Sequence, residues 1–411
     1  MDLRDAAKIA SGLASRLEVE AVDLDSALGR VLAYPFRAGI NIPDEFRSKW
    51  DGFALRSSDS AGASPNTPVT LDILPVEVTA GKLAPSPATA GTCFRIMTGA
   101  VLPAGADAVV PLEDVSTRGN RLVLNRPLAP EKGVILPGSD AARGELLAEE
   151  GDVLTPTRLA VIAAAGADRI NVYRKPRVAV LSTGDELRQL GGESGGPIVF
   201  CNNCHLLANL VTIGGGTPVQ LGIAPDNPDV IYSRLERVKA DLVITTGGLG
   251  KGSRDFILET WRRLGVTAQF EGLNVSPGKG SALGAGAGRI FLGLPGNPWA
   301  SQVVYEEIAA PMLRVFQGVR LAGQFAFDAR ITAGVKKKQG FYHAFYGMFS
   351  HAGEPAFIPG NTVPACSRLP QLRSGFAYIL QGPDTSFVPE GEKVAVKIPD
   401  FPLLSWALLK A

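Results

Sequence analysis

Residues 177–318 alternate short apolar runs with amphipathic segments, and this pattern restricts the fold more than any other feature of the chain. Three runs, at 178–181, 241–245 and 290–294, predict strands that are buried on both faces. Helical spacing predicts helices between and after these strands, and Pro298 begins the last helix. This alternation predicts a parallel, doubly wound α/β sheet.

The flanking regions have a different texture. Helical patterns at 2–17, 24–33 and 155–165 surround short β-like runs rich in glycine and proline, which suggests an inserted β module. After about residue 321 the chain returns to β-runs and turns. We therefore expect an α/β multidomain protein with four parts: a discontinuous helical linker domain (1–38 and 146–172), an inserted β-rich module (39–145), the α/β domain (173–320) and a C-terminal all-β domain (321–411).

Composition excludes several classes of function. The formal net charge is +1, so no net electrostatic field attracts nucleic acid or an acidic membrane. No apolar run is long enough to span a membrane, and the charged N-terminus does not have the pattern of a signal peptide. With 4 cysteines and 3 histidines in 411 residues, a disulfide scaffold and a His-rich metal site are also excluded. We expect a cytoplasmic, reduced protein.

Three predicted strands end in polar loops, at 182–186, 246–252 and 295–298. In a doubly wound sheet, ligands bind beyond the carboxyl ends of the strands. Glycines let backbone amides approach an anion, and Asp185, Glu186 and Asp255 are candidate ligands for Mg²⁺. The alternative is that the glycines form tight turns and the carboxylates cap helices. No P-loop or G-x-G-x-x-G fingerprint is present.

The segment Cys201-Asn202-Asn203-Cys204-His205 matches a haem-attachment pattern and contains a possible redox pair. Covalent haem attachment requires export, and a redox pair is unusual inside an anion-binding sheet. We expect two reduced, unbridged thiols that pack at the start of a helix, with a soft-metal ligand role as the alternative.

Taken together, these loops and the upstream module resemble the MoeA and gephyrin E-domain family of molybdopterin molybdenumtransferases. The matching motifs are RVAVLSTGDEL (177–187), VITTGGLGKGSRDF (243–256), PGK (277–279), GLPGNP (293–298), Asp51-Gly52-Phe53-Ala54, RIMTGA (95–100), PAGADAVV (103–110) and Glu113. They cover most of the chain in order, although the TGDE, GG and GNP loops are shared with MogA-like domains.

The resemblance implies a MogA-like α/β domain that binds molybdopterin, within an elongated homodimer. The site would lie between the α/β domain of one subunit and the β module of the other, and a MogA-like protein is a possible partner. The implied reaction is the Mg²⁺-dependent transfer of molybdate onto adenylylated molybdopterin, with release of AMP. No nucleic acid or membrane is implied as a partner.

The resemblance also assigns roles to particular residues. The implied catalytic residues are Asp51, Asp185, Asp255 and Lys279. The implied cofactor-binding residues are Thr98, Glu113, Thr183, Gly184, Asn203, Gly247, Gly248, Gly278, Pro295, Gly296 and Asn297. The implied Mg²⁺ ligands are Asp185, Glu186 and Asp255.

The sequence resembles a divergent member of that family. Trp50 replaces a Met, the stretch 134–140 lacks arginines, Cys201 replaces an Asp, Ser276 replaces a Lys, and Tyr346 occupies the place of an anion-binding Arg. Loss of cations from an anion site predicts weaker molybdate binding, because each charge-assisted hydrogen bond contributes about 1.5–3 kcal/mol. A second hypothesis is therefore a non-catalytic paralogue that binds molybdopterin or acts as a scaffold. The choice between molybdenum and tungsten, the client enzymes and the presence of a second paralogue stay open.

Overall fold

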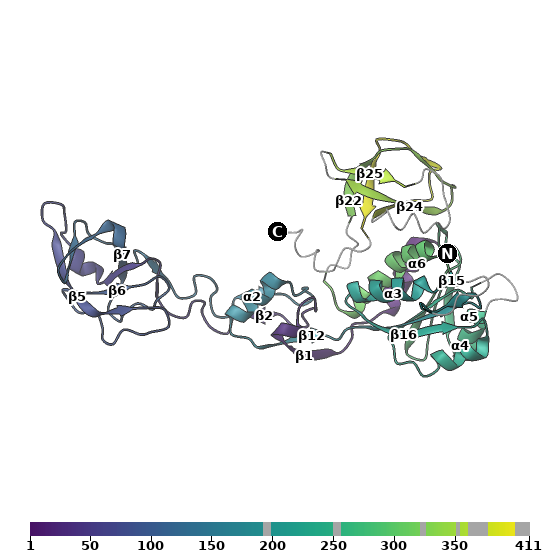
Figure 1. The fold of residues 1–411 in the computed structure, drawn as a ribbon, viewed down its shortest axis with the longest axis horizontal. Helices are drawn as coiled ribbons and strands as arrows, with labels where there is room; N and C mark the ends of the chain where they lie inside the picture. The colour runs from purple at the N-terminus through teal and green to yellow at the C-terminus, as the bar shows by residue number, and fades with distance from the viewer. Residues whose placement is uncertain (192–198, 250–255, 321–325, 351–353, 361–376, 399–411) are drawn as a thin grey trace. The chain divides into compact units, whose positions relative to one another are not determined.

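The computed structural model describes residues 1–191, 199–249, 256–320, 326–350, 354–360 and 377–398 (Figure 1). The chain forms two compact units. The first unit contains residues 1–34, 150–155 and 169–411, and the second contains residues 35–149 and 156–168. Among the described residues, no helix is long and apolar enough to cross a membrane. The finer division into four domains remains a prediction.

The first unit is built on a six-stranded sheet with strand order β16-β13-β17-β21-β20-β18. Its strands are β13 (Arg177–Thr183), β16 (Thr217–Ala224), β17 (Leu242–Thr246), β18 (Thr267–Glu271), β20 (Ala282–Gly286) and β21 (Arg289–Leu294). The pairs β16–β13, β13–β17 and β17–β21 are parallel, which confirms the three predicted strands and their direction. Two features were not expected: β16 lies at one edge, and β20 and β18 add antiparallel pairs at the other.

Helices cover both faces of this sheet, as the alternation predicted. One face packs α1 (Leu3–Leu13), α3 (Asn202–Ile213), α6 (Pro298–Val304) and α7 (Ala310–Phe316) against Val178 and Val180. The other packs α4 (Pro228–Leu235) and α5 (Phe256–Arg263) against Ala179 and Leu181. Successive residues of a strand point to opposite faces, so an apolar run without polar positions is required here. A π-helical turn, η4 (Tyr305–Ala309), joins α6 to α7.

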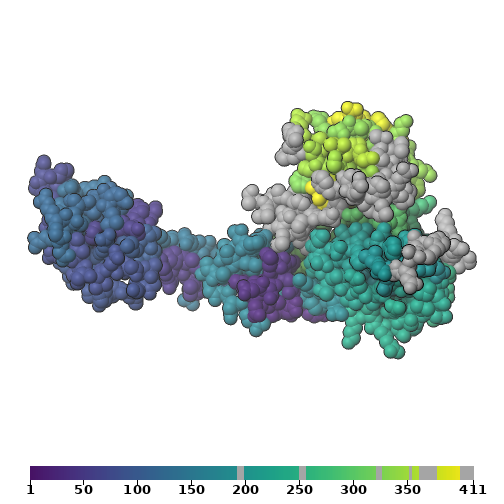
Figure 2. Space-filling view, viewed as in Figure 1, coloured from purple at the N-terminus to yellow at the C-terminus, as the bar shows by residue number. Residues whose placement is uncertain are grey.

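The last part of the first unit is a closed β-barrel. Its strands are β22 (Ala326–Ile331), β24 (Tyr342–Ser350), β25 (Ala356–Pro359), β26 (Ala377–Gln381) and β28 (Lys393–Lys397), and β24 pairs with β26 to close the ring. Short pairs β23 (Val335–Lys336) with β27 (Phe387–Val388), and β19 (Val275–Ser276) with β24, complete it. The barrel packs on the helical layer (Figure 2), where the Tyr378 hydroxyl and Lys397 Nζ both donate to Glu307 Oε1 at 2.6 Å.

Residues 19–33, which follow α1, differ from their prediction. Strand β1 (Val19–Asp23) pairs antiparallel with β12 (Arg169–Tyr173). The helix expected at 24–33 is wrong: only a 3-10 turn, η1 (Leu24–Ser26), forms. Gly29 has φ +72°, which interrupts helical geometry, and Val31 and Leu32 then form bridges to extended segments.

The second unit holds a six-stranded sheet with strand order β7-β4-β6-β5-β9-β8. Its strands are β4 (Gly52–Leu55), β5 (Val69–Val78), β6 (Thr92–Ile96), β7 (Ala108–Pro111), β8 (Ser116–Arg118) and β9 (Arg121–Leu124). Two short antiparallel pairs accompany it: β2 (Phe36–Arg37) with β11 (Leu146–Ala148), and β3 (Arg47–Ser48) with β10 (Val134–Ile135). Helix α2 (Pro156–Ala164) and the 3-10 turns η2 (Ser57–Ser60) and η3 (Leu112–Asp114) complete the elements of this unit.

A short parallel pair, β14 (Leu187–Arg188) with β15 (Val199–Phe200), belongs to the first unit.

Candidate functional site

A cavity of about 150 Å³ lies at the carboxyl ends of the parallel strands, and we call it the strand-end pocket. The loops after β13, β16, β17 and β21 and the first turn of α3 line it, as the topology of a doubly wound sheet requires. The pocket brings together seven of the predicted site residues: Thr183, Gly184, Glu186, Asn203, Gly247, Gly248 and Gly296. The sequence placed these residues on separate loops, and the sheet order makes them neighbours.

Two glycines shape the floor of the strand-end pocket. Gly247 and Gly248 have φ of +87° and +64°, a region that favours glycine. A Cβ on Gly247 would lie 2.3 Å from the Thr183 carbonyl oxygen, so a side chain does not fit there. The backbone of this loop is therefore the surface that a ligand would meet.

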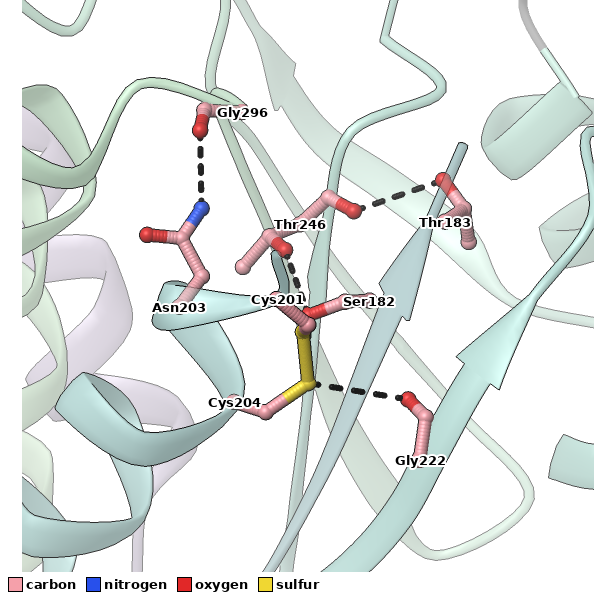
Figure 3. Close-up of a disulfide and its surroundings, with 8 residues drawn as sticks. All are labelled: Ser182, Thr183, Cys201, Asn203, Cys204, Gly222, Thr246 and Gly296. Atoms are coloured by element: carbon pink, nitrogen blue, oxygen red, sulfur yellow. Dashed lines mark hydrogen bonds between the residues drawn. A yellow bond between two sulfur atoms is a disulfide. The ribbon is translucent and has the colours of Figure 1, made fainter. Parts of the chain in front are cut away.

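Hydroxyl groups connect the two central strands at the pocket. Thr183 donates from Oγ1 to the Thr246 carbonyl oxygen at 3.3 Å, and Thr246 donates from Oγ1 to Ser182 Oγ at 3.0 Å (Figure 3). Thr183, Thr246 and Ser182 are all buried. These hydrogen bonds hold the ends of β13 and β17 in register, so the glycine-bearing loops that follow the two strands lie side by side.

Asn203 joins the start of α3 to the loop after β21. Its Nδ2 donates to the Gly296 carbonyl oxygen at 2.8 Å (Figure 3), which fixes the orientation of the amide. Its Oδ1 is buried and has no hydrogen-bond partner among the described residues. A buried acceptor of this kind costs about 1–3 kcal/mol, and a ligand N–H that bonds to it would recover that energy.

Two carboxylates line the strand-end pocket, those of Glu186 and Asp226. Asp185 accepts the Asp226 backbone N–H at 3.1 Å and so holds the Asp226 loop in place. Asp255 lies outside the described residues. Within the described chain no group of three metal-ligating His, Cys, Asp or Glu side chains occurs. Mg²⁺ needs only one or two carboxylates when phosphate oxygens and waters complete its shell, so the donor set fits that ion.

Three further predicted residues support the loops without lining the pocket. Asn297 caps α6, and its Oδ1 accepts the Trp299 and Ala300 N–H groups at 3.0 and 3.2 Å. Pro295 accepts the Ser301 hydroxyl through its carbonyl oxygen. At Gly278 a Cβ would lie 2.6 Å from the Val304 side chain, so close packing requires glycine at this position.

Lys279 lines a different and larger cavity of about 690 Å³, together with Leu249, Glu271 and Phe341. Its Nζ lies 5.7 Å from the centroid of the Phe341 ring. The loop after β17 contributes to both cavities, through Gly248 on one side and Leu249 on the other. The structure therefore does not place Lys279 in the strand-end pocket.

The remaining predicted residues lie in the second unit, where two of them form a direct contact. Thr98 donates from its backbone N–H and its hydroxyl to Asp51 Oδ1, at 2.7 and 2.8 Å. These two hydrogen bonds lower the pKa of the exposed Asp51 carboxyl, so it is ionised at neutral pH. Glu113 lies on the 3-10 turn η3, and the Asp51 carbonyl oxygen accepts the N–H of the preceding Leu112 at 3.2 Å.

The positions where the sequence departs from the family have distinct environments. Two cations lie over the ring of Trp50, with Lys49 Nζ and Lys132 Nζ 5.8 and 5.5 Å from its centroid. Ser276 lies in β19, opposite His343. Tyr346 is 6% exposed and packs edge-to-face on Trp299 at 5.8 Å, so its ring belongs to the core.

The expectation of two unbridged thiols is wrong, because Cys201 and Cys204 form a disulfide (Figure 3). Cys201 is the N-cap of α3 and Cys204 lies one helical turn further, so their Cα atoms are 5.9 Å apart. That separation suits a disulfide. A redox pair was one of the interpretations of the C-x-x-C pattern, and the disulfide agrees with it better than with two packed thiols.

Seven lining residues were not predicted as site residues: Ser182, Leu187, Val199, Cys201, Asn202, Asp226 and Thr246. Asp226 was missed because β16 mixes polar and apolar residues and has no continuous apolar run. Its signal was the sequence Pro225-Asp226-Asn227-Pro228, a turn and helix start of the same kind that follows the other strands.

Comparisons with known proteins agree with this architecture. Residues 1–166 match the family model described as MoeA N-terminal region (domain I and II), and residues 179–315 match the probable molybdopterin binding domain. A molybdopterin molybdenumtransferase of Nostoc sp. is 32% identical over 77% of this chain and 74% of its own length. The Bacillus subtilis molybdopterin molybdenumtransferase is 28% identical over 92% of this chain and 89% of its length.

A solved structure extends the comparison to the whole fold. The molybdopterin biosynthesis MoeA protein from Pyrococcus horikoshii superimposes with a TM-score of 0.85 at 25% identity, and the match covers 97% of this chain and 99% of that chain. The similarity therefore includes both compact units and is not confined to the α/β sheet.

Proposed function

The chain belongs to the MoeA family of molybdopterin molybdenumtransferases, and on this premise we propose that it transfers molybdate onto adenylylated molybdopterin with release of AMP. The observation that carries the proposal is the strand-end pocket, in which glycine amides, hydroxyls, one amide acceptor and two carboxylates converge. This combination suits a ligand with phosphate oxygens and N–H donors.

Each group in the pocket has a proposed task. The start of α3 and the backbone of Gly248 bind phosphate oxygens, because the N–H groups of a first helical turn and the helix dipole favour anions. The Gly247 N–H already donates to the Leu294 carbonyl oxygen at 3.1 Å, so Gly247 shapes the loop. Thr183 adds a hydroxyl beside them. Asn203 accepts a hydrogen bond from a ligand N–H, which orients the molecule within the pocket.

Magnesium is part of the proposal. Glu186 and Asp226 would hold Mg²⁺ from the protein side, with Asp185 positioning the Asp226 loop and Asp255 as a further proposed ligand. Bound there, the ion would supply charge neutralisation at phosphate oxygens. Lys279 and Asp51 are the proposed catalytic groups for molybdate as substrate; Thr98 keeps Asp51 ionised, and Lys279 contributes a cation.

The assay for this function measures AMP released from adenylylated molybdopterin by chromatography, with and without molybdate and Mg²⁺. We expect release that requires molybdate and that Mg²⁺ stimulates. Asp226→Asn should lose most of the stimulation, because it removes one proposed ligand charge. Asp229→Asn is the matched control, since Asp229 is an exposed acid on the next helix that pairs with Arg263. Release independent of molybdate, or equal loss in both variants, contradicts the proposal.

A second candidate is a molybdopterin-binding protein without transferase activity. The neutral residues at Cys201 and Ser276 favour it, because neither supplies the charge expected of an anion site. It predicts binding of adenylylated molybdopterin by calorimetry together with no AMP release in the same assay.

The physiological setting completes the proposal: a cytoplasmic homodimer, with a MogA-like protein as a possible partner. Sedimentation of the purified chain tests the dimer, and cell fractionation tests the location.

A further inference from the structure

The Cys201–Cys204 disulfide lies in the wall of the strand-end pocket, and the proposed function makes no use of it. The two residues are 4% and 8% exposed, so a reagent has little access to the sulfurs from bulk solvent. The disulfide closes the first turn of α3 beside Asn203 and the ends of β13 and β17 (Figure 3). Any molecule that occupies the pocket is therefore next to an oxidised sulfur pair.

The two sulfurs have different surroundings. Cys201 is one of the residues that line the pocket, whereas Cys204 is not. Cys204 Sγ faces the sheet, where it lies 3.2 Å from Ser182 Oγ and 4.0 Å from the Gly222 carbonyl oxygen. A thiol that enters the pocket consequently reaches Cys201 first, and Cys204 is on the far side of the S–S bond.

The surroundings of Cys204 suit a leaving thiolate. Ser182 Oγ accepts a hydrogen bond from Thr246, so its own hydrogen is available to donate to the Cys204 sulfur. Cys204 also lies in the first turn of the 12-residue helix α3, where the helix dipole stabilises a negative charge. Exchange is faster when the departing sulfur is a stabilised thiolate.

We propose that Cys201 and Cys204 form a thiol–disulfide exchange site whose substrates are low-molecular-weight dithiols. One thiolate of the dithiol attacks Cys201 Sγ, a mixed disulfide forms, and the electron pair of the broken S–S bond stays on Cys204 Sγ, which takes a proton. The second sulfur of the dithiol then attacks the first sulfur of the same molecule, which is bonded to Cys201 Sγ. The bond to Cys201 Sγ breaks, and Cys201 leaves as a thiol. The dithiol is oxidised by two electrons to a disulfide, and the cysteine pair is reduced to two thiols.

The size of the pocket selects small dithiols over protein thiols. The cavity has a volume of about 150 Å³, and backbone loops form its wall. A second protein cannot enter this cavity without displacing those loops. In one respect the inference rests on the proposed function: molybdopterin carries two neighbouring sulfurs and so belongs to the same chemical class. The exchange chemistry itself requires only the pocket and the pair.

The test labels the purified full-length chain in a Cys366→Ser background, because Cys366 lies outside the described residues. The oxidised protein is treated with 2-mercaptoethanol to trap the mixed disulfide, or with dithiothreitol followed by iodoacetamide, and peptide masses locate each modification. We expect the mixed disulfide on Cys201, and alkylation of Cys201 about tenfold faster than of Cys204 in the reduced protein. Thioredoxin should reduce the pair more slowly than dithiothreitol at equal thiol concentration.

Cys93 provides an internal control for unfolding. It is buried in the second unit, and burial raises the pKa of its thiol to about 12, so it should stay unlabelled in the folded protein. Reduction of the pair that occurs only together with Cys93 labelling would mean that exchange requires unfolding of the whole chain, since Cys93 lies in the second unit and the pair in the first. A mixed disulfide on Cys204, or faster reduction by thioredoxin, would equally overturn the proposal.

Ser182 is a positioning residue in this scheme, and its variant separates chemistry from packing. Ser182→Ala should slow reduction by dithiothreitol about three- to tenfold, because the leaving thiolate loses a donor, while the alkylation rate of reduced Cys201 stays unchanged. Ser281→Ala is the matched control, since Ser281 is a buried serine that donates to the Gly278 carbonyl oxygen. Equal effects of the two variants would contradict the role of Ser182. None of these readouts involves AMP release, so failure here leaves the proposed function standing, and the reverse also holds.

Discussion

Asn203 should contribute much more to ligand binding than to folding, and Asn203→Leu tests this directly. The substitution removes one hydrogen bond, from Nδ2 to the Gly296 carbonyl oxygen, whose net contribution to folding is about 0.5–1.5 kcal/mol. It also removes a buried oxygen with no partner among the described residues, which costs the folded state about 1–3 kcal/mol. Gly296 is exposed, so water can replace the lost donor. The two contributions nearly cancel, and we expect the free energy of unfolding to change by no more than about 1 kcal/mol.

Ligand binding should respond differently to the same substitution. Without the Oδ1 acceptor, the ligand N–H stays unpaired inside the pocket, which costs about 1–3 kcal/mol and lowers affinity about tenfold or more. Urea unfolding followed by circular dichroism measures the first quantity, and calorimetric titration with adenylylated molybdopterin measures the second.

Gln317→Leu is the matched control for this experiment. Gln317 is a buried amide at the end of α7, where its Nε2 donates to the Leu313 carbonyl oxygen at 2.9 Å and to the carbonyl oxygen of Gly214, at the end of α3, at 2.8 Å. This variant should lose about 1–3 kcal/mol of stability and keep its ligand affinity. If Asn203→Leu instead unfolds the protein at much lower urea and binds ligand normally, the reasoning from the unpaired acceptor is refuted.

Three further predictions concern the loops and the divergent positions. Gly247→Ala should destabilise the protein by about 2 kcal/mol or more in urea unfolding, because φ is +87° and the new Cβ meets the Thr183 carbonyl oxygen. Gly265→Ala is the control for the backbone contribution, since Gly265 has φ +71° and open space around the Cβ. Molybdate affinity should be at least about tenfold below that of a relative with the family cations, a factor that corresponds to about 1.4 kcal/mol, and Ser276→Lys should raise it. If calorimetry shows no gain in this variant, the loss of cations does not explain the affinity. Tyr346→Arg should lower the thermal midpoint without restoring molybdate binding, because the ring packs on Trp299 in the core; a stable variant that binds molybdate more tightly would show that position 346 faces the anion after all.

The α/β architecture could be predicted from the sequence because the signal for it is local. A strand buried on both faces in a parallel sheet must be apolar at every position, and 178–181 and 290–294 meet that requirement without reference to the rest of the chain. Helix starts are equally local: Asn227 and Asn297 cap α4 and α6 through bonds to the next two or three residues. The resemblance to the MoeA family likewise rests on short motifs.

Long-range pairing settled the composition of the site. Asp226 reaches the strand-end pocket because β16 pairs with β13, and the mixed sequence of β16 does not reveal that pairing. Lys279 lines the neighbouring cavity, although its motif PGK (277–279) is one of those that carry the family resemblance. Tyr346 enters the core because β24 lies against α6. The Cys201–Cys204 disulfide, by contrast, is a local contact within one helical turn. Which side chains share a cavity depends on sheet order, and sheet order is not encoded in the spacing of residues along one segment.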